Sequence, residues 1–203
     1  MTRAPAAAAI ILAAGASTRM GRPKALLTLH GETFLDRLIR VFAAAGASPI
    51  VVLGHGATQI AAEARRCSEA MLVLNPHPEC GQLSSLQCGL AAASSAFDVL
   101  LFTPVDSPGV DSATIRRLIS EWSEAGRPPV ATPRCQGRHG HPVAIRRDVA
   151  DELLAAPPDA SAREILHQHS PETLRVDVED AAVLWDLDDE AALRAALEEK
   201  SRA

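Results

Sequence analysis

The sequence predicts an α/β fold in which a mostly parallel sheet is covered by helices on both faces. Apolar runs of strand length alternate with amphipathic stretches of helix length along the chain, which is typical of this fold class. The 203 residues, 47% of them hydrophobic, suffice for one substantial core, and neither internal repeats nor a low-complexity linker divide them. We therefore expect a single domain over residues 1–203.

The first expected strand, residues 7–13, is an unbroken apolar run, and the helix expected at 34–45 is followed by Gly46, a residue that commonly ends helices. Further strands are expected at 49–53, 70–74, 99–102, 127–133, 141–147, 174–178 and 183–184. Further helices are expected at 58–66, 83–95, 112–124, 149–154, 162–168 and 190–199.

Charge and composition exclude several classes of protein. The net charge of -5 argues against a general binder of nucleic acid or membrane surfaces, because such proteins usually carry an excess of cations over a whole face. The four cysteines show no Cys-x-x-Cys spacing and fit a reduced, cytoplasmic compartment. An apolar stretch at 6–14 superficially resembles a signal peptide, but it ends in a cationic loop, and no segment has the ~20 apolar residues of a membrane span.

The segment "IILAAGASTRMGRPKALL" at 10–27 is the most informative stretch, because a buried-strand pattern leads directly into a glycine loop that carries Arg19, Arg22 and Lys24. Backbone N–H groups and cations at such a position commonly bind phosphates. A P-loop is excluded, since Ala25 follows Lys24 where serine or threonine is needed. The glycine spacing also excludes a dinucleotide fingerprint.

This segment closely resembles the signature Leu-Ala-Ala-Gly-x-Ser-x-Arg-Met-Gly-x-x-Lys of the MobA-like NTP transferases. The matching residues are Leu12, Ala13, Ala14, Gly15, Ser17, Arg19, Met20, Gly21 and Lys24. The resemblance implies a three-layer, Rossmann-like nucleotidyltransferase fold, with the backbone of 12–15 against the nucleobase and sugar. It also implies that Arg19 and Lys24 reach the triphosphate. The alternative is a cationic surface loop held by salt bridges.

Asp106 lies in "LLFTPVDSPGV", at the carboxyl edge of an expected strand, where open parallel sheets bind ligands. In the MobA-like family an aspartate at this place coordinates Mg2+, and carboxylates are ligands that Mg2+ accepts together with phosphate oxygens and water. The resemblance therefore implies Mg2+ as cofactor and Arg19, Lys24 and Asp106 as the catalytic set. A turn aspartate before Pro108 is the alternative.

Two further elements match the family. In "GQLSSLQCGL", Gly81, Ser85 and Leu86 match a Gly-x-x-x-Ser-Leu element, which implies contact of Gly81 and Ser85 with the nucleotide; an ordinary capped helix is the alternative. In "GRHGHPVAI", the segment of Gly140, His141 and Pro142 matches a Gly-His-Pro element that implies the acceptor side of the cleft. A histidine with a purely structural role is the alternative there.

The segment "LWDLDDEAAL" aligns with the acidic segment near the end of relatives, from which a side chain completes the metal site. Asp186, Asp188 and Leu193 match, whereas residues 189–192 depart from the family's Thr-Pro-Glu-Asp. We favour Asp188 as the second metal ligand and keep Asp186 as the alternate. An acidic helix start is the alternative, since carboxylates favour helix N-termini.

Together these residues predict the transfer of NMP from an NTP to a phosphorylated small molecule, with release of pyrophosphate. Ala14, where guanylyltransferases generally carry glycine, together with the segments "GRPK" and "GHP", makes the chain resemble the molybdenum cofactor cytidylyltransferases most. The resemblance thus implies CTP and molybdopterin as substrates and a molybdoenzyme as a further partner. Two alternatives stay open: a sugar- or polyol-phosphate nucleotidyltransferase, and a carrier of the molybdenum cofactor without catalytic activity.

Overall fold

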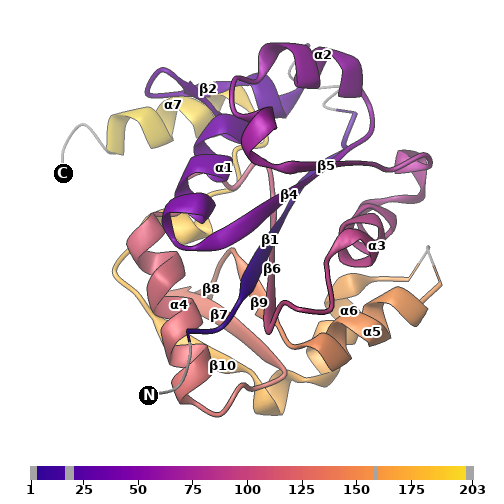
Figure 1. The fold of residues 1–203 in the computed structure, drawn as a ribbon. Coiled ribbons are helices and arrows are strands. Elements are labelled where there is room, and N and C mark those ends of the chain that lie inside the picture. The colour runs from indigo at the N-terminus through magenta and orange to yellow at the C-terminus, as the bar shows by residue number, and fades with distance from the viewer. Residues whose placement is uncertain (1–3, 17–20, 158–159, 200–203) are drawn as a thin grey trace.

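The computed structural model describes residues 4–16, 21–157 and 160–199, and its centre is a twisted sheet (Figure 1). In spatial order the sheet consists of β10 (Leu174–Asp177), β7 (Val130–Cys135), β9 (Val143–Ile145), β6 (Val99–Pro104), β1 (Ala7–Ala13), β4 (Ala47–Leu53) and β5 (Met71–Leu74). A short strand, β8 (Arg138–His139), pairs with β7 outside this order.

Most neighbouring strands are parallel, which confirms the predicted fold class. Strand β1 pairs in parallel with both β4 and β6, and β10 pairs in parallel with β7. Strand β9 runs antiparallel to both β6 and β7, because a short hairpin through β8 returns the chain directly beside β7. The two segments expected at 127–133 and 141–147 are thus two neighbouring strands of the same sheet.

Helices cover both faces of the sheet (Figure 1). They are α1 (Phe34–Ala44), α2 (Ala57–Glu63), α3 (Gln82–Ala92), α4 (Ser112–Glu124), α5 (Arg147–Ala155), α6 (Ala162–Gln168) and α7 (Glu190–Glu199). Helices α1, α4 and α7 pack in one hydrophobic core, and α3, α5 and α6 pack in the other. None of the described helices is both long and apolar enough to cross a bilayer.

Strand β1 separates the two cores because its side chains alternate between the faces of the sheet. Ile11 belongs to the core of α1 and α4, and its neighbours Ile10 and Leu12 belong to the core of α3 and α5. Helix α3 approaches closely through Gly89, where a Cβ atom would lie 2.5 Å from Cγ2 of Ile10. This close packing fixes the position of α3 relative to β1.

The expected helices at 58–66 and 83–95 end earlier, at Glu63 and Ala92, and the expected loop 134–140 contains strand β8. Two further features differ from the sequence-based expectations. The strand expected at 183–184 is wrong: the segment forms a 3-10 helix, Ala181–Leu184, because the Asp180 carboxylate accepts a hydrogen bond from the Ala182 N–H and starts a turn. A small hairpin of β2 (Thr28–Leu29) and β3 (Glu32–Thr33) was not expected. It leads into α1, where the Thr33 hydroxyl caps the helix by accepting a hydrogen bond from the Asp36 N–H.

Candidate active site

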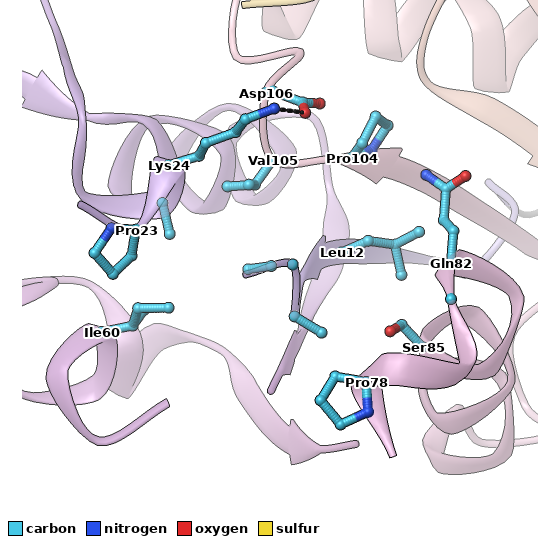
Figure 2. Close-up of a pocket in the computed structure, with 15 residues that line it drawn as sticks. Leu12, Pro23, Lys24, Ile60, Pro78, Gln82, Ser85, Pro104, Val105 and Asp106 are labelled. Carbon is cyan, nitrogen blue, oxygen red and sulfur yellow. Dashed lines mark hydrogen bonds and ion pairs between the residues drawn. The ribbon is translucent and has the colours of Figure 1, made fainter. Parts of the chain in front are cut away.

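A cavity of about 210 Å3 lies at the carboxyl ends of β1 and β6 (Figure 2). Because these strands are adjacent and parallel, the loops that follow them meet at one edge of the sheet. The cavity is lined by Leu12, Ala13, Ala14, Gly15, Pro23, Lys24, Ala25, Ile60, Pro78, Gly81, Gln82, Ser85, Pro104, Val105 and Asp106. The sequence predicted eight of these positions as nucleotide-binding or catalytic: Leu12, Ala13, Ala14, Gly15, Lys24, Gly81, Ser85 and Asp106.

Lys24 projects from a 3-10 helix, Lys24–Leu26, whose other two residues are buried in the core. Its ammonium Nζ lies 2.8 Å from Oδ2 of Asp106 and also contacts Oδ1 of Asp188 (Figure 2 shows the first contact). The side chains of Lys24 and Asp106 are only 18% and 19% exposed, so water screens this ion pair weakly. Two predictions from distant parts of the sequence, the cationic loop and the strand-end aspartate, therefore meet directly.

The pKa of Lys24 reflects two opposing effects. Burial disfavours the ammonium and on its own lowers the pKa of Lys24, but the hydrogen bonds and charges of Asp106 and Asp188 outweigh burial and raise the pKa above its usual value. Lys24 is therefore a fixed cation at neutral pH. A cation placed beside a cavity with a glycine-bearing wall suits an anionic ligand.

Three carboxylates gather beside Lys24. Asp106, Asp186 and Asp188 each offer an oxygen, and these oxygens lie within 4.8 Å of one another. Burial, followed by the charges of Asp106 and Asp188, raises the pKa of the Asp186 carboxyl, although Lys24 partly offsets this effect. Hard divalent cations prefer such an oxygen donor set, and a cation would relieve the mutual repulsion of the three groups. The residues present therefore fit a divalent metal ion.

Direct contacts hold the acidic segment 186–188 against the loop after β6. The Leu187 N–H donates to the Asp106 carbonyl at 2.9 Å, and the His141 N–H donates to the Val183 carbonyl at 2.9 Å. Close packing reinforces these bonds, because a Cβ atom on Gly140 would lie 2.2 Å from the Val183 oxygen. Asp189 also caps α7 by accepting a hydrogen bond from the Ala192 N–H at 2.8 Å. The departure from the family motif at 189–192 therefore preserves the start of the helix.

A second cavity, of about 340 Å3, adjoins the first and shares Gln82, Pro104 and Asp106 with it. Its remaining lining residues are Ser107, Arg138, His139, Gly140, His141, Val183, Leu184, Trp185, Asp186 and Asp188. Gly140 and His141, predicted on the acceptor side, thus line a space beside the nucleotide residues, whereas Pro142 is buried next to it and is not among its lining residues. Burial lowers the pKa of His141, and the nearby charge of Asp106 only partly offsets this.

A buried asparagine holds the far end of the first cavity, where Figure 2 shows Pro78 and Ser85. Asn75 is 3% exposed, and its amide Nδ2 donates to the hydroxyls of both Ser84 and Ser85 at 3.0 Å. Its Oδ1 accepts a hydrogen bond from the His77 N–H at 2.8 Å. Sequence reasoning missed Asn75, because it is an ordinary loop residue in "NPHPECG" until α3 is placed against it.

Three residues of the predicted signature lie outside the described residues: Ser17, Arg19 and Met20. The described part of the site nevertheless combines an anion-binding cation, a carboxylate cluster suited to a divalent metal, and two cavities that meet at Asp106. Such an arrangement can bring an anionic group from one ligand to an anionic group of another while compensating the charge of both.

The model of the MobA-like NTP transferase domain matches residues 9–173. A nicotine blue oxidoreductase from Paenarthrobacter nicotinovorans is 34% identical over 82% of this chain and 84% of its own length. A molybdenum cofactor guanylyltransferase from Xanthomonas euvesicatoria is 32% identical over 55% of this chain and 52% of its own length. The chain also matches GlmU proteins described as bifunctional, such as that of Bifidobacterium longum subsp. infantis, but it spans only 27% of the length of that protein.

Among solved structures, Rv0371c from Mycobacterium tuberculosis, in complex with manganese, superimposes with a TM-score of 0.79 at 27% identity. The alignment covers 95% of this chain and 98% of Rv0371c. The likeness therefore extends over the whole arrangement of strands and helices, and its manganese is a divalent ion of the kind that the carboxylate cluster fits.

Proposed function

The chain belongs to the MobA-like NTP transferase family of nucleotidyltransferases, and we propose that it transfers CMP from CTP to molybdopterin with release of pyrophosphate. We also propose that residues 1–203 form one such domain. The observation that carries the proposal is that a cavity with the predicted nucleotide residues and a second cavity with the predicted acceptor residues share Asp106. Two substrates bound there would place their reacting phosphates beside the carboxylates.

The proposed reaction needs no nucleophile from the protein. A phosphate monoester has a second pKa near ~6, so the acceptor is already largely dianionic at neutral pH. Its oxygen attacks the α-phosphorus of the nucleotide, and the bond between that phosphorus and the pyrophosphate oxygen breaks. The main obstacle is the approach of two anions, so catalysis depends on positioning and charge compensation.

Different residues of the chain would position the substrates and compensate their charges. Lys24, together with Arg19, would bind the triphosphate and stabilise the departing pyrophosphate. Asp106 and Asp188 would hold Mg2+, with Asp186 as the alternate second ligand. When bound, Mg2+ supplies positive charge to the phosphate oxygens and helps to align them. Gly81 and Ser85, at the start of α3, would contact the ribose and the edge of the base.

The preference for CTP rests on Ala14. Its side chain lies close against the loop after β4, since a Cβ atom on Gly54 would lie 2.9 Å from the Ala14 Cβ. Ala14 also lines the cavity, and we propose that its methyl group, which glycine lacks, favours the smaller base. The similarity to a molybdenum cofactor guanylyltransferase points to a guanine nucleotide instead. An assay therefore has to decide which nucleotide the protein uses.

The second candidate is a sugar- or polyol-phosphate nucleotidyltransferase, because the same fold and metal chemistry can serve many acceptors. The relative matched over most of its length carries an oxidoreductase name. The site argues against redox chemistry as the main activity. Three clustered carboxylates beside a lysine suit a reaction between phosphate groups, which needs a metal ion and charge compensation, whereas a hydride transfer does not need them.

The deciding experiment measures pyrophosphate release with each of CTP, GTP, UTP and ATP, in the presence of Mg2+ and molybdopterin. We expect release with CTP and little with the other nucleotides. Release with GTP would move the assignment to a guanylyltransferase, and release with UTP and a sugar phosphate would support the second candidate. Nucleotide binding without release, under all of these conditions, would indicate a cofactor carrier.

A further inference from the structure

A third cavity, of about 240 Å3, lies between α6 and the edge of the sheet formed by β7 and β10, away from the nucleotide cavity. Figure 1 shows α6 on the face of the sheet that α5 also covers. The cavity is lined by Val130, Thr132, His139, Val143, Arg163, Leu166, His167, Ser170, Thr173 and Arg175. The two valines and Leu166 form an apolar wall, and all three belong to or pack against the core of α3 and α5.

The polar side chains of this cavity are cationic or neutral donors. Arg163 and His167 lie one turn apart on α6 and therefore share a face, while His139 comes from β8 and Arg175 from β10. The described residues that line the cavity include no aspartate or glutamate. This cavity therefore differs in charge from the carboxylate-rich site at Asp106.

Among the described residues, no acidic side chain forms an ion pair with Arg163 or Arg175. Asp177 is paired with Arg134, with 2.6 Å between Oδ1 and Nε, and Glu152 contacts His169 at 2.7 Å. Arg175 donates only to neutral groups, among them the Ser170 carbonyl at 3.2 Å and the Ser170 hydroxyl at 3.3 Å. Arg175 is exposed, so its guanidinium is solvated by water in the free protein and is accessible to an anionic ligand.

Thr132 provides an independent indication that a ligand binds there. It lines the cavity, is 9% exposed, and its hydroxyl Oγ1 has no hydrogen-bond partner among the described residues. A buried hydroxyl without a partner costs free energy, and a valine of similar shape would avoid that cost. Oγ1 is closed to water as the side chain stands, so the hydroxyl is explained if a bound ligand turns the Thr132 side chain and completes its hydrogen bonding.

We propose that this cavity binds a phosphate or carboxylate group carried on an apolar body. Arg163 and Arg175 supply guanidinium donors for the anion, and each imidazole offers at least one N–H in either protonation state. Val130, Val143 and Leu166 contact the apolar body, and the Thr132 hydroxyl contacts its polar edge.

The anionic group on its apolar body can come from two sources. His139 lines both this cavity and the second cavity at Asp106, so an acceptor bound there can extend into the third cavity with a distal anionic group. A separate small organic anion is the other source. The first source rests on the proposed function, whereas the existence of the anion site does not.

The test uses phenyl phosphate as the probe, without nucleotide, and amide NMR shifts as the readout. We expect saturable shifts at 163–175 that benzyl alcohol, the neutral counterpart, does not produce. The double variant Arg163→Gln/Arg175→Gln should weaken this binding about tenfold or more, because it removes two charged donors. Thr132→Val should weaken it severalfold while the melting temperature stays equal or rises.

The control variant is Arg117→Gln, which removes one positive charge from α4, where Arg117 pairs with Glu121. The proposal is wrong if phenyl phosphate causes no saturable shifts at 163–175 in the wild type. It is also wrong if the double variant binds phenyl phosphate as tightly as the wild type. Equal weakening in the control would also overturn it, because the effect would then be general electrostatics.

Turnover of the double variant identifies the source of the anion. A raised KM for the acceptor with kcat retained would assign the cavity to a distal group of the acceptor. An unchanged acceptor KM, with phenyl phosphate binding lost, would assign it to a separate anion; both results support the site. If the wild type binds phenyl phosphate at 163–175 but transfers no nucleotide, only the proposed function fails.

Discussion

The ammonium of Lys24 lies 2.8 Å from the carboxylate of Asp106, although 82 positions separate the two residues in the sequence. The ion pair joins the glycine loop after β1 to the end of β6, and it lies where the nucleotide cavity meets the second cavity. Because Lys24 also contacts Asp188, it compensates both carboxylates that we propose as metal ligands. A divalent metal ion held there would compensate the same two carboxylates as Lys24.

Replacing Lys24 by alanine should reduce turnover by about 10²- to 10³-fold, the range found when one preorganised electrostatic group is removed from an active site. The measurement is pyrophosphate release at saturating nucleotide, with the melting temperature recorded for the same sample. Lys24→Arg keeps the charge and serves as the matched variant, with a smaller loss. An unchanged rate in Lys24→Ala would remove this residue from the triphosphate site.

The carboxylates can be ranked by metal binding without nucleotide, measured as the binding of Mn2+ by electron paramagnetic resonance. Asp106→Asn and Asp188→Asn should each weaken Mn2+ binding strongly, and Asp186→Asn should weaken it less. Lys24→Ala should bind Mn2+ more tightly than the wild type, because no ammonium competes for Asp106 and Asp188. If Asp186→Asn weakens Mn2+ binding more than Asp188→Asn does, Asp186 and not Asp188 is the second ligand.

Much of the fold was predictable because its signals are local. The apolar run at 7–13 is strand β1, and the amphipathic stretch before Gly46 is α1. The same holds for α4, α6 and α7, whose bounds agree with those expected. The glycine loop and Asp106 could be placed together because carboxyl ends of parallel strands share one edge of the sheet.

Other features depend on contacts between distant segments and could not be predicted. The segment 183–184 is apolar like a strand, but Asp180 and the packing against Gly140 make it a 3-10 helix beside the site. Asn75 matters only because α3 brings two serine hydroxyls to it. The third cavity combines residues of β7, β8, α6 and β10, and no spacing in the sequence marks them as neighbours.

Asn75 should act as a positioning residue for the nucleotide. Asn75→Ala removes the hydrogen bonds to Ser84 and Ser85 and loosens the loop that carries Pro78. We expect the KM for the nucleotide to rise about five- to tenfold, while kcat changes little, since a net hydrogen bond is worth about 1 kcal/mol. Ser120→Ala on α4 is the control. A variant that lowers the folded fraction but leaves KM unchanged would reduce Asn75 to a purely structural role.

His141 should make stability depend on pH in a defined direction. Burial lowers its pKa in the folded protein below the usual 6.5, so the unfolded chain takes up the proton first as the pH falls. Its contribution to stability is therefore present above pH 6.5 and is lost as the pH falls through that value. In thermal unfolding at pH 7.5 and 5.5, His141→Gln should lose less stability than the wild type. Equal losses would show that the folded protein accepts the proton as readily as the unfolded chain.

Gly15 offers a test that separates ligand binding from folding. It lines the nucleotide cavity, and a Cβ atom there would meet no atom within 4 Å, at a backbone conformation open to alanine. Gly15→Ala should therefore keep the melting temperature of the wild type. If the nucleotide lies against this backbone, the added methyl group occupies its space, and affinity should fall by roughly 10- to 200-fold, the range for one methylene in a shaped pocket.

Gly46→Ala provides the opposite control. Gly46 follows α1 with a φ of +86° and also has open space around its Cβ position, so alanine there is strained by conformation alone. That variant should lower the melting temperature and leave nucleotide affinity unchanged, when both are measured by calorimetry in Mg2+. Nucleotide affinity unchanged in Gly15→Ala would mean that the ligand does not approach the backbone after β1, and the assignment of the first cavity to the nucleotide would be wrong.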